Sequence, residues 1–156
     1  RFLREGGAHA VKLEGTACLP AIERMIEIGI PVMGHLGFAP QSIYMMGGPR
    51  VQGKTDESAK QLLKDAKTLE TAGVFALVLE LVPDDLAAEV TKSLKIPVIG
   101  IGAGKNCDGQ VLVIHDLLGL TEGKTPKFVK RYAELGQEAR KAVASFTGDV
   151  RSRKFP

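Results

Sequence analysis

Short runs of apolar residues recur along the chain and alternate with longer stretches of helical periodicity. Each run is rich in Val, Ile and Leu and is too short for a helix, which is typical of strands buried on both faces of a parallel sheet. The pattern predicts strands at Ala10–Leu13, Pro31–Met33, Val74–Leu79, Ile96–Ile101 and Gln110–Ile114.

The stretches between these runs are amphipathic. From Ser58 to Ala72 apolar residues recur at three- and four-residue steps, and the glycine that follows is a common helix stop. A second helix is expected to begin at Asp84, where acidic residues follow a proline. A last long helix is expected to begin near Pro126 and to bury Phe128, Val129, Tyr132, Leu135 and Ala139. The polar tail, Gly148–Pro156, is predicted to be surface coil.

The repeated alternation of strand and helix predicts an α/β fold with a parallel sheet. A doubly wound sheet and a barrel would both fit, but the absence of a dinucleotide-binding glycine turn and the polar residues that end the strands favour a (β/α)8 TIM barrel. Five strands cannot close such a barrel. We therefore expect residues 1–156 to be the C-terminal part of a single barrel catalytic domain, supplying about its last five βα units, with three strands before Arg1.

Composition narrows the class of protein. The chain has 156 residues, of which 44% are hydrophobic, and its formal charge of +3 is spread along the sequence. Aromatic residues make up only 5%, so no nucleic-acid-binding surface is indicated. The apolar runs are too short to cross a bilayer. Cys18 and Cys107 lie far apart, as expected of reduced thiols in a cytoplasmic protein.

Ionisable residues end several of the predicted strands. Because successive strand side chains point to opposite faces, Lys12 and Glu14 share one face, and the apolar residues between them face the helices. Glu80 closes the strand that begins at Val74, and His35 is expected at the end of another. Barrel enzymes hold their sites at these strand ends. His115, after the last predicted strand, is a weaker candidate.

Each of these residues also has a purely structural explanation. Lys12 and Glu14 could form an interior ion pair, His35 could be a hydrogen-bonded core residue, and Glu80 could be a solvated helix cap. Burying four such groups in one cavity would cost several kcal/mol unless they pair or meet a ligand or a metal, and the combination therefore favours a catalytic site. The glycines from Gly100 to Gly104 could approach a ligand or simply form a tight turn.

Sequence motifs along the whole chain resemble the ketopantoate hydroxymethyltransferase family. Mild departures from the family pattern are Thr16, Pro49 and Leu81. The matching segments are Val11–Gly15, Gly29–Gly37, Pro40–Ser42, Val51–Lys54, Val78–Glu80, Ile99–Gly104, Cys107–Leu112 and Pro126–Ala133.

This resemblance implies transfer of a hydroxymethyl group from 5,10-methylenetetrahydrofolate to 3-methyl-2-oxobutanoate, a 2-oxo acid, in pantothenate biosynthesis. It implies a Mg²⁺-stabilised enolate, with Glu80 as the general base. Lys12 would contact the substrate oxygens. Glu14 would bind the metal, at least partly through water. His35 would help to position Glu80 and the new hydroxyl. The remaining metal ligands would precede Arg1, so an isolated fragment of this length is expected to be inactive.

The resemblance also implies a homo-oligomer in the form of a large ring, located in the cytoplasm or, in a eukaryote, in mitochondria. It leaves the folate-binding residues open, with the loops Gly37–Thr55 and Gly102–Gln110 as candidates. Two other interpretations remain. One is a related Mg²⁺-dependent barrel enzyme acting on another oxo acid, such as the phosphoenolpyruvate mutase and isocitrate lyase relatives. The other is a non-catalytic half-barrel that serves in assembly or binding.

Overall fold

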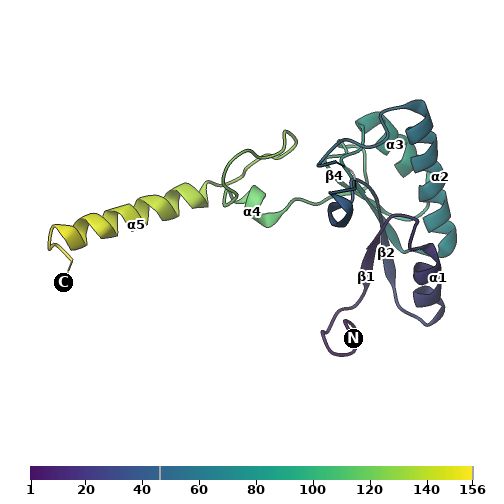
Figure 1. Ribbon diagram of the computed structural model, residues 1–156, viewed down its shortest axis with the longest axis horizontal. Coiled ribbons are helices and arrows are strands. Elements are labelled where there is room, and N and C mark those ends of the chain that lie inside the picture. The colour runs from purple at the N-terminus through teal and green to yellow at the C-terminus, as the bar shows by residue number, and fades with distance from the viewer. Residues whose placement is uncertain (46, 156) are drawn as a thin grey trace. The chain divides into compact units, whose positions relative to one another are not determined.

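The computed structural model describes residues 1–45 and 47–155, which include all of the predicted loop Gly37–Thr55 except Met46 (Figure 1). The chain forms two compact units, Arg1–Val111 and Leu112–Pro156, and each is described by itself. The prediction that residues 1–156 belong to one catalytic domain stays a prediction.

The first unit is built on a parallel five-stranded sheet whose strands follow one another in chain order. Each strand pairs in parallel with the next one along the chain. This unidirectional winding is that of a (β/α)8 barrel, whereas a doubly wound sheet reverses direction at a switch point. The predicted α/β class with a parallel sheet is confirmed. The strands are β1 (Val11–Glu14), β2 (Val32–Gly37), β3 (Ala76–Glu80), β4 (Val98–Ile101) and β5 (Gly109–Gln110).

Three helices cover one face of this sheet, as Figure 1 shows. A capping box between Thr55 and Ser58 lets the second helix start two residues earlier than predicted, and Gly73 ends it with a φ of 95°. The first helix, which the apolar pattern did not predict, follows β1. The helices are α1 (Leu19–Glu27), α2 (Asp56–Ala72) and α3 (Asp84–Ser93), and a short 3-10 helix spans Pro40–Ser42.

Strand alternation divides the sheet into two chemically different faces. Val32, Leu77 and Val98 point toward the helices and are almost completely buried in the apolar core. Burial of each such side chain stabilises the fold by roughly 1.5–3 kcal/mol. The side chains between them point the other way, so Lys12, Glu14 and Glu80 are presented together on the face that the helices leave uncovered, as predicted.

The last predicted strand, Gln110–Ile114, is wrong beyond its first residue. The Val111 N–H donates to the carbonyl of Gly100, and the chain then leaves the sheet. Val111 and Val113 are about half exposed, so this apolar run has no core to enter within the described residues. His115 consequently lies in the short helix α4 (Ile114–Leu117) of the second unit and not at a strand end.

The predicted start of the last helix was also wrong. Helix α5 spans Leu135–Arg151, so it begins nine residues after Pro126 and continues into the segment predicted to be coil. Two backbone hydrogen bonds tie the preceding segment to α4 and its C-cap, because the N–H groups of Tyr132 and Leu135 donate to Leu117 and Leu118 at 2.8 and 3.0 Å. Tyr132 is 68% exposed, not buried as predicted.

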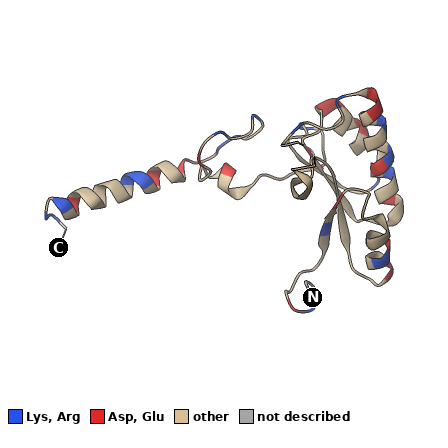
Figure 2. Cartoon of the chain, viewed as in Figure 1, with Lys and Arg blue, Asp and Glu red and all other residues tan. Residues whose placement is uncertain are grey.

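Charged residues are interspersed over the helices rather than gathered into a patch of one sign (Figure 2). No helix within the described residues is both long and apolar enough to span a membrane.

Candidate active site

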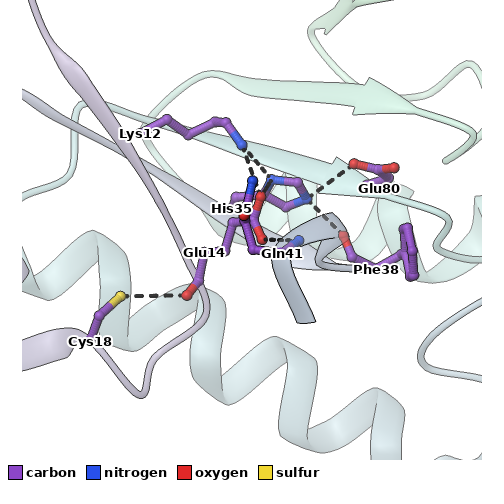
Figure 3. A network of polar contacts seen from close by, with 7 residues as sticks. All are labelled: Lys12, Glu14, Cys18, His35, Phe38, Gln41 and Glu80. Carbon is purple, nitrogen blue, oxygen red and sulfur yellow. Dashed lines mark hydrogen bonds and ion pairs between the residues drawn. The ribbon is translucent and has the colours of Figure 1, made fainter. Parts of the chain in front are cut away.

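His35 is the centre of a polar cluster on the uncovered face of the sheet (Figure 3). Its β2 position pairs in register with Glu14 on β1 and with Val78 on β3. The Lys12 ammonium lies 2.9 Å from His35 Nδ1 and 3.4 Å from Glu14 Oε1. Glu80 reaches the other ring nitrogen, with Oε2 3.4 Å from His35 Nε2. The structure thus brings all four predicted site residues together.

The contacts of the imidazole define its protonation state. A lysine ammonium only donates hydrogen bonds, so His35 Nδ1 must accept the one from Lys12. Nε2 then carries the proton and donates to the Phe38 carbonyl at 2.9 Å. Burial lowers the pKa of His35, and the nearby Lys12 ammonium lowers it further, against a smaller opposing effect of Glu14. His35 is therefore a neutral imidazole near neutral pH.

Glu80 is the last residue of β3, and backbone hydrogen bonds hold the chain at this point. The Phe38 N–H donates to the Glu80 carbonyl at 2.7 Å, and the Leu81 N–H donates to Ile101 on β4 at 3.0 Å. Leu81 takes a left-handed φ of 50°. Burial raises the pKa of the Glu80 carboxyl, an effect that Lys12 partly offsets. A carboxylate with a raised pKa is a stronger base.

Glu14 is held from several sides at the end of β1. Its Oε2 accepts from the Gln41 backbone N–H at 3.2 Å, and its Oε1 lies 3.8 Å from His35 Nδ1. Behind it, the Cys18 thiol donates to the carbonyls of Glu14 and Gly15 at 3.4 and 3.2 Å. The carboxylate thus lies between the Lys12 ammonium and one backbone donor, the Gln41 N–H, and its side chain is only 14% exposed.

One detail of the predicted site was wrong. His35 is not the terminal residue of its strand, because Leu36 and Gly37 continue the pairing with Leu79 and Glu80 on β3. The Phe38 backbone, which holds both His35 and Glu80, was not predicted. No sequence signal marks it, since a backbone N–H and a carbonyl are present at almost every position.

Comparison with known proteins shows the family of the chain. The sequence profile described as Ketopantoate hydroxymethyltransferase matches residues 1–156. The chain belongs to the ketopantoate hydroxymethyltransferase family.

Several curated relatives of this chain are named 3-methyl-2-oxobutanoate hydroxymethyltransferase. The protein of Anaeromyxobacter dehalogenans is 55% identical over 100% of this chain and 51% of its own length. Those of Pseudothermotoga lettingae and Salinibacter ruber are 55% and 57% identical over 100% of this chain and 59% of their own lengths. The chain thus spans about half the length of these curated relatives.

The described residues of this chain supply only part of a metal site. Within residues 1–45 and 47–155, no three His, Cys, Asp or Glu side chains are grouped to hold a metal ion. Glu14 nevertheless offers carboxylate oxygens beside the cluster, and oxygen is the ligand type that Mg²⁺ prefers. The residue therefore fits a magnesium ion as one oxygen ligand, directly or through water, and not as a complete site.

A cavity of about 390 Å³ opens beside Glu14 and His35. Its walls come from the loop after β1, the segments Gly37–Ser42 and Gln52–Gly53, and the first turns of α2. Side-chain hydrogen bonds hold the glycine-rich loop after β4: the Gly104 carbonyl accepts from the Gln110 side-chain amide at 2.9 Å, and the Asp84 carboxylate accepts from the Asn106 side-chain amide at 3.0 Å.

Proposed function

We propose that the full-length protein transfers a hydroxymethyl group from 5,10-methylenetetrahydrofolate to 3-methyl-2-oxobutanoate, giving ketopantoate. The observation that carries this proposal is the cluster of Lys12, His35 and Glu80, which lie on neighbouring parallel strands with Glu80 at the carboxyl end of β3, in a chain of this family. Relatives that share 55–57% identity with the chain bear the name of this transferase.

Glu80 is proposed to remove the proton from C3 of the oxo acid. Its partly buried carboxylate, with a raised pKa, suits abstraction of a weakly acidic C–H proton. The bond between C3 and the proton breaks, the proton passes to Glu80, and the electron pair moves toward the keto oxygen to give the enolate. Water supplies the oxygen of the new hydroxyl group: it adds at the methylene carbon of the folate, and the two C–N bonds break to release tetrahydrofolate and a carbon at the oxidation level of formaldehyde. Carbon C3 of the enolate bonds to this carbon, and its oxygen takes up a proton to become the hydroxyl.

Lys12 is proposed to bind the oxygens of the oxo acid. Its ammonium has three N–H donors, and contacts with His35 and Glu14 engage two of them within the described residues. The third can donate to the substrate carboxylate or keto oxygen. A fixed positive charge at this point favours the developing oxyanion more than the ground-state ketone.

His35 is proposed to position both groups rather than to exchange a proton. Its neutral ring holds the Lys12 ammonium at one nitrogen and stands 3.4 Å from Glu80 at the other. Because the Phe38 carbonyl fixes the ring from the Nε2 side, the distance between cation and base is set before substrate binds. After transfer, Glu80 and His35 would face the new hydroxyl.

Mg²⁺ is proposed as the metal of the complete site, where it would act as a Lewis acid toward the substrate oxygens. Glu14 would hold it from the β1 side, directly or through water. The hydrogen bond from the Gln41 N–H orients the Glu14 carboxylate. We also propose that the protein is cytoplasmic and forms a homo-oligomer. Sedimentation analysis of the full-length protein would test the oligomeric state.

Proton exchange tests the role of Glu80. With the full-length protein, Mg²⁺ and 3-methyl-2-oxobutanoate in D₂O, NMR should show loss of the C3 proton signal. The Glu80→Gln variant should exchange roughly 100- to 10,000-fold more slowly, the range expected for loss of a general base. Glu89→Gln is the matched control, because Glu89 is exposed on α3 away from the cluster. Equal exchange by the parent and Glu80→Gln would contradict the proposed role.

A further inference from the structure

The cavity beside Glu14 and His35 has the size of a small-molecule site. Its volume of about 390 Å³ lies within the range of roughly 300–1,000 Å³ that such pockets show. Leu36 and Leu62 supply apolar walls, and side chains from the first turns of α2 supply polar groups. Because Glu14 and His35 belong to both the cavity and the catalytic cluster, a molecule bound here would lie directly beside the oxo acid.

The charges of the lining indicate which of the two substrates the cavity suits. Among the described residues no Lys or Arg lines it, whereas two carboxylates, Glu14 and Asp65, do. An anionic 2-oxo acid would meet no cationic side chain of the described residues in this lining, and Lys12, the cation proposed to bind it, lies outside the lining. The cavity therefore suits an uncharged partner that donates hydrogen bonds.

Asp65 is a carboxylate in the cavity lining that can accept such hydrogen bonds. It is half buried on α2, and the Gln61 amide one helical turn earlier donates to its Oδ1 at 2.8 Å. This contact holds the carboxylate in one orientation and leaves Oδ2 and the remaining lone pairs for a ligand. A carboxylate pairs well with two adjacent N–H donors on one edge of a planar group, as it does with arginine.

We infer that this cavity binds the pterin ring of tetrahydrofolate, with Asp65 accepting from its 2-amino group and the neighbouring ring N–H. The ring system is uncharged and bicyclic, and its pyrimidine half is flat, so it can pack on Leu36 and Leu62 while its donor edge meets Asp65. The inference rests on the proposed function, since the folate is the one-carbon donor of that reaction. It makes Asp65 and Gln61 determinants of donor binding.

Calorimetry of the full-length protein with tetrahydrofolate tests this assignment. Asp65→Asn, which keeps the side-chain shape, should raise the Kd by about 10- to 100-fold, the loss expected for charge-assisted hydrogen bonds. C3 proton exchange of the oxo acid measured without folate should be unchanged in the variant. Glu57→Gln is the matched control, because Glu57 is exposed on the same helix and does not line the cavity.

The possible results distinguish a failure of the pterin assignment from a failure of the proposed transferase function. If 6-methyltetrahydropterin competes with tetrahydrofolate and loses affinity in Asp65→Asn, the pterin assignment is supported. If the parent binds tetrahydrofolate and Asp65→Asn binds it equally well, the assignment is overturned while the transferase proposal stands. A higher KM for the oxo acid in Asp65→Asn, with donor affinity unchanged, would mean that the cavity binds the oxo acid, and it would also overturn the pterin assignment. A parent that exchanges the C3 proton but binds no folate would overturn both the donor and the assignment.

Discussion

Gly37 connects the stability of the sheet with the position of the proposed base. Its φ of 93° lies in the left-handed region, and a methyl group built on it would overlap the Glu80 carbonyl oxygen and approach Val82 Cγ2 to 2.8 Å. Replacement by alanine must therefore push apart the ends of β2 and β3. The hydrogen bond from Phe38 to the Glu80 carbonyl would be lost at the same time.

The expected cost of Gly37→Ala has two parts. The left-handed conformation costs a non-glycine residue about 1–2 kcal/mol. Loss of the Phe38 hydrogen bond adds about 1 kcal/mol, so the free energy of unfolding should fall by roughly 2–3 kcal/mol. Gly29→Ala is the matched control, because Gly29 has a φ of 83° but no heavy atom of the described residues lies within 4 Å of an added methyl group. It should lose only the first part.

Urea unfolding and C3 proton exchange, measured on both variants of the full-length protein, test this reasoning. Gly37→Ala should unfold with about 1 kcal/mol less stability than Gly29→Ala. Its exchange rate should fall on the order of 100-fold, since a displacement of about 1 Å at a reacting group can cost that much. Gly29→Ala should keep the parent rate. Equal stability and equal rates in the two variants would refute the proposed contact between Gly37 and Glu80.

Three further predictions concern charge and backbone conformation. Lys12→Met removes a charge that lowers the pKa of Glu80, so the acid limb of the exchange-rate profile should move to higher pH; a limb that stays or moves down would contradict the coupling. Leu81→Gly should be about 1 kcal/mol more stable than Leu81→Ala in urea, the reverse of the usual order, because residue 81 is left-handed; the ordinary order would argue against that conformation. The folded-state pKa of His35 is lowered, so its stabilising contribution is complete above its unfolded pKa of about 6.5 and is lost as pH falls through the lower folded value. Thermal unfolding across this window should show that pH dependence in the parent and lose it in His35→Gln.

Much of the site could be predicted from the sequence because strand alternation is a geometric rule. Apolar residues at Val11 and Leu13 require the helix side of β1, which leaves Lys12 and Glu14 no other face. Glu80 was predicted as the residue that closes its strand, on the face of Ala76 and Val78. The sequential order of the strands then places these residues side by side, so family resemblance was not needed to group them.

The remaining features depend on contacts that a sequence pattern does not contain. The run from Gln110 to Ile114 is as apolar as a strand, yet only two residues, Gly109 and Gln110, pair with β4. The segment after Pro126 has helical periodicity, but backbone hydrogen bonds to the α4 segment hold it in another conformation. In the same way, the Phe38 backbone contacts and the cavity at Asp65 arise from tertiary packing.

Transfer of an isotope label tests the central claim most directly. The full-length protein, supplied with Mg²⁺, 3-methyl-2-oxobutanoate and 5,10-methylenetetrahydrofolate carrying ¹³C at the methylene carbon, should produce ketopantoate labelled at its hydroxymethyl carbon, as detected by NMR. The label should not appear with the Glu80→Gln variant. If a folded, magnesium-loaded parent leaves the label on the folate, even while it exchanges the C3 proton, the proposed hydroxymethyl transfer is contradicted.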